Sequence, residues 1–296
     1  MTINGPIPLQ IIVNGFANGA VYAILAIGFL FVYSIHRFFY LAFGGVILAT
    51  AFTFVLTHNA LHFPIILSCI AAVGAALTTS AFNESLLHAP SRRLFAPDDT
   101  LSPFIISSVV LLVYQNAALL IFGPISYVLP LPIKTFAAGE ITVSLYQLVQ
   151  IALLVPVTVA AAILLNESTI GKQFRALRDS STLSQSSGLN TDRLFMSVTL
   201  VSGLLGSIAA MIIAINQDVR YTLGTTIILK TVLAAIVGGG RGPIGVAVSA
   251  IALGLFEAFA TWVFPTGLSD AFLGLILVLI LVVAPKGLLN LAARQQ

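Results

Sequence analysis

The sequence has little charge for its length, since Asp, Glu, Lys and Arg together make up 8% of its 296 residues. In soluble proteins about a quarter of the residues are charged. Hydrophobic residues make up 58% of the chain, and the mean hydropathy is +1.06. The 13 basic and 10 acidic side chains cannot cover such an apolar chain in water. The composition therefore excludes a soluble enzyme, a nucleic-acid-binding protein and a disordered chain, and it predicts an integral membrane protein.

Residues that commonly carry chemistry are also scarce. Cys69 is the single cysteine, which excludes an intrachain disulfide and a cysteine-based metal cluster. His58 and His62 are four apart, but they fall in an expected short loop before Pro64 and lack further ligands, so we expect no metal site. The segment around Gly171 lacks the first glycine and the hydroxyl of a phosphate-binding loop. We therefore expect no catalytic residue, cofactor or ATPase site in this chain.

Long apolar runs without alternating polarity, such as 105–113 and 275–283, indicate membrane-spanning helices and not a β-barrel. We predict an all-α fold, a polytopic integral membrane helix bundle with eight or nine transmembrane helices. The alternative of eight spans would make one segment, such as 222–239, re-entrant. The nine predicted segments are 9–33, 38–57, 63–82, 101–122, 145–166, 194–215, 222–239, 243–264 and 268–284.

The basic residues predict how the chain is oriented, because cytoplasmic loops are enriched in Lys and Arg. With nine spans and the N-terminus outside, only Lys134 and Arg220 among the loop residues lie outside. The residues then placed inside are Arg37, Arg92, Arg93, Lys172, Arg175, Arg178, Arg193, Arg241, Lys286 and Arg294. This arrangement predicts a cytoplasmic C-terminus. No linker divides the chain, so we predict a single transmembrane domain over 1–296.

The longest polar connection, 167–193, contains a short amphipathic pattern. Phe174 and Leu177 are three residues apart and share one face of a short helix. Basic residues surround this face, namely Lys172, Arg175 and Arg178. The pattern is typical of an element that lies on a membrane or docks into a partner. The alternative is a positively charged loop that serves only to set the topology.

Two ionisable residues, Lys230 and Glu257, fall within predicted spans. An unpaired charge at mid-depth of a bilayer costs at least about 2.5 kcal/mol, so each should face the bundle interior or water. They are candidates for the translocation path. Alternatively, they form an ion pair between helices, or Lys230 extends its side chain to the outer interface.

Further path candidates are polar or glycine residues at the ends of spans. Asn14, Asn18 and Tyr22 are each four residues apart, so they align on one helix face, either toward a substrate or toward a neighbouring helix. Gly238 and Gly239 begin the run 238–243, which cannot continue a stable helix. Such a break either exposes backbone groups to a cavity and permits close helix packing, or forms an ordinary turn.

Several motifs resemble one family in a common order along nearly the whole chain. Asn14-Gly15, followed by Gly19, Tyr22 and Ala23, is similar to the opening of branched-chain amino-acid ABC transporter permeases, the Liv-type membrane subunits. The later similarities are Arg175-Ala176 with 188–193 in the cytoplasmic loop, 234–239 with Gly245 at a Gly-rich turn, Glu257, and the closing segment 285–288. One segment departs from the family pattern. The chain keeps Ala42 and Gly44 but has Tyr40 in place of the usual Asn, which predicts a more apolar segment there.

The resemblance implies a permease subunit of an ATP-driven ABC importer for branched-chain amino acids or a related small polar solute, such as other amino acids, urea or amides. It implies a multi-pass protein of the bacterial inner membrane, surrounded by lipid and paired with a second homologous permease. Two ABC ATPase subunits, which carry ATP and Mg, would dock at 167–193, and an extracytoplasmic substrate-binding protein would deliver the solute. The alternatives are a gradient-driven secondary transporter or channel that uses Lys230 and Glu257, and a structural membrane scaffold.

Overall fold

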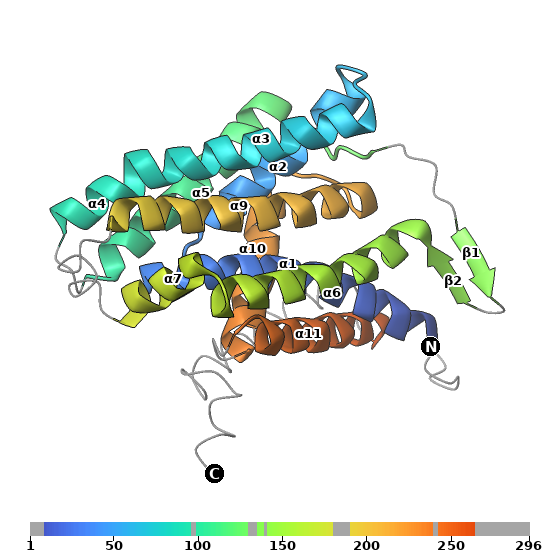
Figure 1. Cartoon of the computed structure of the whole chain (residues 1–296). Helices are drawn as coiled ribbons and strands as arrows, with labels where there is room; N and C mark the ends of the chain where they lie inside the picture. The colour runs from blue at the N-terminus through green and yellow to red at the C-terminus, as the bar shows by residue number, and fades with distance from the viewer. Residues whose placement is uncertain are drawn as a thin grey trace, which may run out of the picture.

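The computed structural model describes residues 9–95, 99–129, 135–138, 141–179, 190–238 and 242–263. Long helices that run roughly side by side form most of this part of the chain (Figure 1). The elements are α1 (Leu9–His36), α2 (Ala42–Asn59), α3 (Ile65–Phe82), the π-helix η1 (Asn83–His88), α4 (Ala89–Leu94), α5 (Leu101–Phe122), β1 (Thr135–Ala138), β2 (Ile141–Ser144), α6 (Leu145–Asn166), α7 (Thr169–Asp179), α9 (Thr191–Asn216), α10 (Leu223–Val237) and α11 (Pro243–Val263).

Within the described residues, seven helices are long and apolar enough to cross a membrane. Helices α5 and α6 have the bounds predicted from the sequence. Helix α10 has 15 residues and is about 22 Å long, which is shorter than a hydrocarbon core of about 30 Å. The predicted segment 268–284 lies outside the described residues. The described part of the chain is therefore a polytopic helix bundle of the predicted kind.

Two predicted span boundaries were wrong. The third span continues through η1 and α4 as one apolar stretch, Ile65–Arg92, and does not end at residue 82. The second begins at Ala42 and not at residue 38, because Arg37 has a left-handed backbone (φ 58°) and residues 37–41 form a turn. The all-α prediction also missed an antiparallel hairpin of β1 and β2, in which Thr135 pairs with Ser144.

Helix α1 is the central element of the bundle. It contacts α6, α7, α9, α10 and α11, and almost all of its span is buried. Helices α3, α5 and α6 lie at the periphery, where few of their residues are buried. Exposed side chains on these helices are large and apolar, for example Ile66 at 72% and Leu120 at 85% exposure. A bilayer is the environment in which such surfaces are stable.

Glycines allow two pairs of helices to approach closely. Gly15 and Gly19 of α1 face Gly254 of α11, and a Cβ atom added to Gly19 would lie 2.7 Å from the Ile251 Cα. Gly44 of α2 faces Gly224 of α10 in the same way, with 2.7 Å between an added Cβ and the Gly224 carbonyl oxygen. Small residues at such contacts bring backbones together and increase van der Waals packing in membranes. The glycines of the opening motif therefore form a helix-packing seam.

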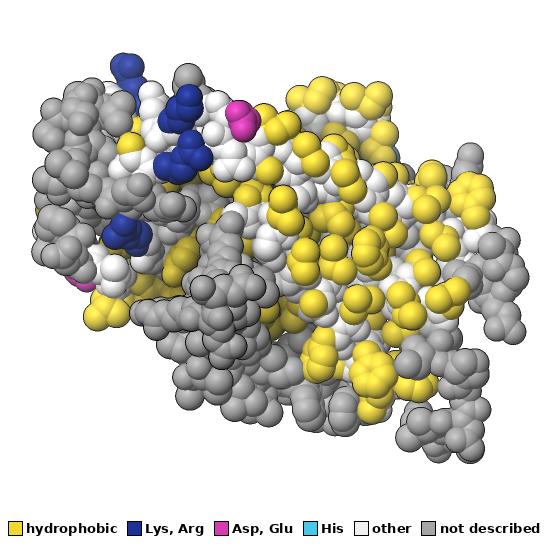
Figure 2. Space-filling model, turned by 60° about the horizontal axis from the view of Figure 1, so that its bottom comes forward, with side chains coloured by type: hydrophobic (Ala, Val, Ile, Leu, Met, Phe, Trp, Pro, Cys, Tyr) yellow, Lys and Arg dark blue, Asp and Glu magenta, His cyan; other side chains and the backbone are white. Residues whose placement is uncertain are grey.

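The two ends of the bundle differ in charge. Helices α4 and α7 and the start of α9 lie at one end, and the hairpin and the start of α1 lie at the other (Figure 1). We call the first of these the basic end, because Lys and Arg side chains gather over it while apolar side chains cover much of the rest of the surface in view (Figure 2). At the opposite end, Tyr127 and Val219 join two loops through a pair of backbone hydrogen bonds of 3.0 and 2.8 Å. Such an asymmetry of basic residues is typical of polytopic membrane proteins.

Capping groups fix the ends of the well-predicted helices. The Ser144 hydroxyl accepts the Gln147 N–H, and the Gln147 side chain accepts the Ser144 N–H, which forms a capping box at the start of α6. Before α5, the Asp99 carboxylate accepts the N–H groups of Leu101 and Ser102 and the Ser102 hydroxyl. The hydrogen bond from this hydroxyl holds the pKa of Asp99 below its usual value.

Candidate coupling surface and translocation path

Helix α7 is the described part of the predicted polar loop, and it follows α6 after a tight turn. Ser168 forms this turn, because its hydroxyl donates to the Leu164 carbonyl and accepts the Gly171 N–H. Gly171 is buried where a Cβ would overlap the carbonyl groups of Leu164 and Leu165. The turn therefore holds α7 against the end of α6 at the basic end of the bundle.

The apolar face of α7 contacts the chain's own core. Phe174 and Leu177 are each 3% exposed, and the Phe174 ring packs edge-on against Phe31 of α1, with 6.4 Å between ring centroids. The helix and its apolar face were predicted correctly, but the expectation that these two side chains lie on a membrane or dock into a partner was wrong. Phe174 instead packs against α1, and Leu177 is buried in the same apolar core.

The basic side of α7 remains available. Lys172 and Ala176 are exposed, and Arg175 is half-buried with its guanidinium donating to the Asn166 carbonyl at 3.2 Å. The side chain of Arg178 lies outside the described residues, as does the segment 180–189. The surface that α7 offers to a partner is therefore cationic and polar.

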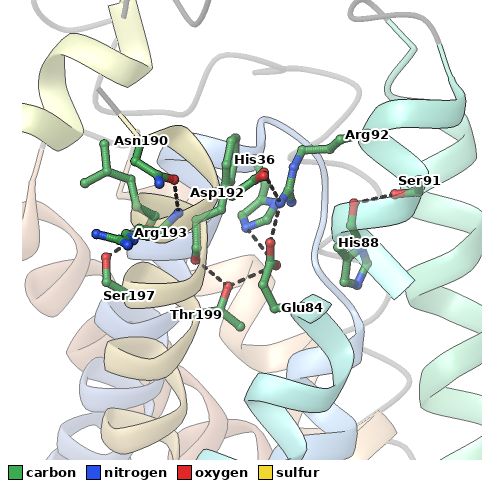
Figure 3. A network of polar contacts seen from close by, with 12 residues as sticks. His36, Glu84, His88, Ser91, Arg92, Asn190, Asp192, Arg193, Ser197 and Thr199 are labelled. Atoms are coloured by element: carbon green, nitrogen blue, oxygen red, sulfur yellow. Dashed lines mark hydrogen bonds and ion pairs between the residues drawn. The ribbon is translucent and has the colours of Figure 1, made fainter. Parts of the chain in front are cut away.

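A buried polar network lies at the same end, and sequence reasoning missed it (Figure 3). Its centre is Glu84 of η1, whose side chain is 1% exposed. The Arg92 guanidinium of α4 donates to Glu84 Oε1 at 2.6 Å, and the Thr199 hydroxyl of α9 donates to Oε2 at 3.3 Å. The Nε2 atom of His36, the last residue of α1, lies 3.7 Å from Oε2. Glu84 thus connects three segments that are distant in the sequence.

Arg92 extends the network toward the start of α9. Its Nη2 atom lies 3.9 Å from Asp192 Oδ1, and its guanidinium carbon lies 3.9 Å from the centre of the Phe195 ring. A cation over an aromatic face at this distance is stabilised by the ring quadrupole. Asn190 caps the same end of α9 by accepting the Arg193 N–H at 3.1 Å. The network therefore fixes the basic ends of α1, α4 and α9 relative to each other, close to α7.

Lys230 and Glu257 form the ion pair that was one of the two predicted alternatives. Lys230 Nζ of α10 lies 2.6 Å from Glu257 Oε1 of α11, and each side chain is 12% exposed. The Tyr22 ring of α1 lies near the ammonium, with 5.8 Å between Nζ and the ring centre. Three helices therefore meet at this pair.

Asn14, Asn18 and Tyr22, which share one face of α1, have different neighbours. The side-chain Oδ1 atom of Asn14 accepts side-chain N–H groups of Gln10 and of Gln147 in α6, so Asn14 links α1 to α6. Asn14 and Asn18 also border a recess of about 250 Å³ between α1 and α11. The residues that line it are Ile11, Asn14, Asn18, Ala258, Thr261 and Trp262. Tyr22 lies deeper and is 2% exposed.

The remaining predicted residues pack against neighbouring residues of the chain or lie outside the described residues. Gly238 is buried at the end of α10, where an added Cβ would lie 2.7 Å from the Val246 Cα, while Gly239 lies outside the described residues. His58 lies in the last turn of α2 and not in a loop, and its Nδ1 atom is 3.1 Å from the Phe63 carbonyl oxygen. Tyr40 is 1% exposed and belongs to the core.

Comparison with known proteins finds one family, and most of the chain matches it. Residues 11–281 match the family described as branched-chain amino acid transport system, permease component. The high-affinity branched-chain amino acid transport system permease protein BraD of Pseudomonas aeruginosa is 25% identical over 298 residues, which cover 95% of each chain. The corresponding protein LivH of Escherichia coli K12 is 25% identical over 310 residues, again 95% of each chain. A probable LivH protein of Methanocaldococcus jannaschii is 25% identical over 133 residues, or 43% of this chain and 42% of that one.

Proposed function

The chain belongs to the family of permease components of branched-chain amino acid transport systems, and we propose that it is the membrane-spanning permease subunit of an ATP-driven ABC importer for branched-chain amino acids or related small polar solutes. The relatives BraD and LivH, which are branched-chain amino acid transport system permeases, support this solute class. In this proposal the chain performs no covalent chemistry, and ATP and Mg bind to partner subunits.

The observation that carries the proposal is the position of α7. This helix packs against α1 through Phe174, Leu177 is buried in the core, and the cationic side of the helix is exposed at the basic end. Two ABC ATPase subunits would bind at this end, one on this chain and one on a second homologous permease. ATP binding would then favour one conformation of the pathway by binding it more tightly, because a ligand of equal affinity for both conformations shifts neither.

The two ends of the bundle have different roles in this proposal. The basic end, with α7 and the network around Glu84, lies in the cytoplasm of a bacterium, and the C-terminus lies on the same side of the inner membrane. The opposite end, with the hairpin and the recess beside Asn14, faces an extracytoplasmic substrate-binding protein. The translocation path follows α1, α10 and α11, where Tyr22, Lys230 and Glu257 meet.

Charge reversal on α7 tests the coupling role. In the variant Lys172→Glu/Arg175→Glu, we expect ATP-dependent uptake by the complete complex to fall at least about tenfold, because a cationic docking surface becomes anionic. Membrane insertion and the yield of the permease pair should not change, since Phe174 and Leu177 still anchor the helix. Uptake of radiolabelled leucine and pull-down of the ATPase subunits measure the two effects.

The control for this variant is Arg220→Glu, which changes an exposed basic residue in the connection between α9 and α10, at the end of α9 away from α7. We expect it to retain ATPase binding, because it lies away from the basic end. If Lys172→Glu/Arg175→Glu retains full uptake, α7 does not couple the permease to ATP hydrolysis.

A further inference from the structure

A polar track leads from the recess to the ion pair. Thr261 of α11 lines the recess, and Glu257 lies four residues earlier on the same helix face. On α1, Asn18 lines the recess and Tyr22 lies four residues further along. Lys230 completes the track from α10 by pairing with Glu257. Tyr22, Lys230 and Glu257 therefore lie about one helical turn beyond the residues that line the recess.

The ion pair leaves one acceptor available. Lys230 Nζ contacts Glu257 Oε1 at 2.6 Å. The second carboxylate oxygen, Glu257 Oε2, is buried and has no hydrogen-bond partner in the part of the chain that the structure describes. A buried acceptor normally has a partner, so this oxygen requires a donor from outside these residues. It is the point at which an ammonium group can bind without first breaking the pair.

We propose that Lys230 and Glu257 form a binding site for a zwitterionic amino acid, in which the α-ammonium group binds Glu257 and the α-carboxylate replaces Glu257 at Lys230 Nζ. This inference rests on the proposed function, and it names the groups of the path that recognise the solute. No covalent bond is formed or broken. The internal ion pair is replaced by two ion pairs with the solute.

Charge balance gives the site its selectivity. A zwitterion supplies a partner for each of the two buried charges, so that neither is left alone when the internal pair opens. An amine or a carboxylic acid with a single charge supplies one partner and leaves the other residue without the charge partner that it has in the internal pair, which is unfavourable. The recess of about 250 Å³ is below the range of about 300–1,000 Å³ of pockets for drug-sized ligands. It therefore suits a small solute.

Replacement of the pair by apolar residues separates this role from a structural one. Apolar residues of similar size often replace a buried ion pair without loss of stability. In Lys230→Met/Glu257→Leu, measured in the complete complex in proteoliposomes with its binding protein, we expect leucine uptake to fall at least about tenfold. Assembly and thermal stability of the complex should be retained. The matched control for stability is Asp218→Leu/Arg220→Met, which removes an exposed pair of 3.3 Å outside the helix bundle interior and should be as stable as the wild type.

The single variants test charge selectivity. Glu257 alone remains in Lys230→Met, and we expect low leucine uptake by this variant, which isopentylamine, a compound without the carboxylate of leucine, inhibits further. Lys230 alone remains in Glu257→Gln, and there we expect inhibition by 4-methylpentanoate, which lacks the ammonium group. Neither compound should inhibit the wild-type complex. The binding protein is the same in every assay, so a difference between variants arises in the permease.

The outcomes distinguish the inference from the proposed function. If the wild-type complex transports leucine and the apolar double variant transports it equally well, the pair is structural and the zwitterion site is refuted, while the permease assignment stands. If the wild-type complex does not transport any amino acid, the proposed function fails and the inference fails with it. Loss of uptake in a stable double variant, together with the two different inhibition patterns, supports the site.

Discussion

The substitution Gly254→Leu is expected to destabilise the folded chain by about 3 kcal/mol, because it places a side chain in a contact between two backbones. A Cβ atom at Gly254 would lie 2.5 Å from the Gly15 carbonyl oxygen and from the Gly19 Cα, and it would also overlap the Gly19 nitrogen. Backbone atoms cannot rotate away, so α1 and α11 must separate. Unfolding of the purified protein by heat or by denaturing detergent measures the loss.

The matched control is Gly74→Leu in α3. Gly74 is also a helical glycine, but it is exposed, and an added Cβ would have no neighbour within 4 Å among the described residues. We expect this variant to be as stable as the wild type. Equal stability of both variants would show that α1 and α11 do not pack through the glycine seam.

A second large effect is expected from Glu84→Ala. The substitution removes the carboxylate that pairs with Arg92 at 2.6 Å and accepts the Thr199 hydroxyl. Breaking a buried pair by removing one partner costs about 3–5 kcal/mol, because the other charge is left without compensation. We therefore expect a large loss of thermal stability.

Two further variants show whether this loss comes from the unpaired charge. In Glu84→Leu/Arg92→Met both charges are removed, and we expect much of the stability to return. In Asp218→Ala the exposed pair with Arg220 is broken, and the expected cost is about 0–1 kcal/mol. If Glu84→Ala is no less stable than Asp218→Ala, Glu84 does not cross-link α1, α4 and α9.

Span boundaries were predictable where the signals are local. Helices α5 and α6 end where expected because an apolar run of suitable length is bounded by residues that cap or stop a helix. Asp99 precedes α5, Gly123 follows it with a left-handed backbone (φ 73°), and Ser144 and Gln147 form the capping box of α6. These groups act within a few residues of the helix end, so the sequence alone contains them.

The continuation of the third span was not predictable in this way. Glu84 and Arg92 look like the polar end of a helix, and what keeps them buried is contact with His36 and Thr199, which are distant in the sequence. One signal was present, because residues eight apart on a helix lie about two turns apart on one face. That spacing identifies a pair but does not reveal the elements that cover it.

The candidate site shows the same limit. The spacing of Phe174 and Leu177 predicted the apolar face of α7, but periodicity does not tell which surface covers a face, and here it is α1. Polarity within spans identified Lys230 and Glu257, and their pairing was one of two alternatives that only the structure distinguished. Gly15 and Gly19 were recognised as part of the opening motif, but the sequence does not show that they contact Gly254. That contact depends on how the helices pack.

The central claim is that this chain moves solute only as part of an ATP-driven complex. The most direct test is leucine accumulation in proteoliposomes that contain either the complete complex, with its partner permease, two ATPase subunits and binding protein, or this chain alone. We predict accumulation against a gradient by the complete complex that requires ATP and is insensitive to ionophores, and no accumulation by the chain alone. Uptake by the chain alone that an ionophore abolishes would contradict the account and establish gradient-driven transport.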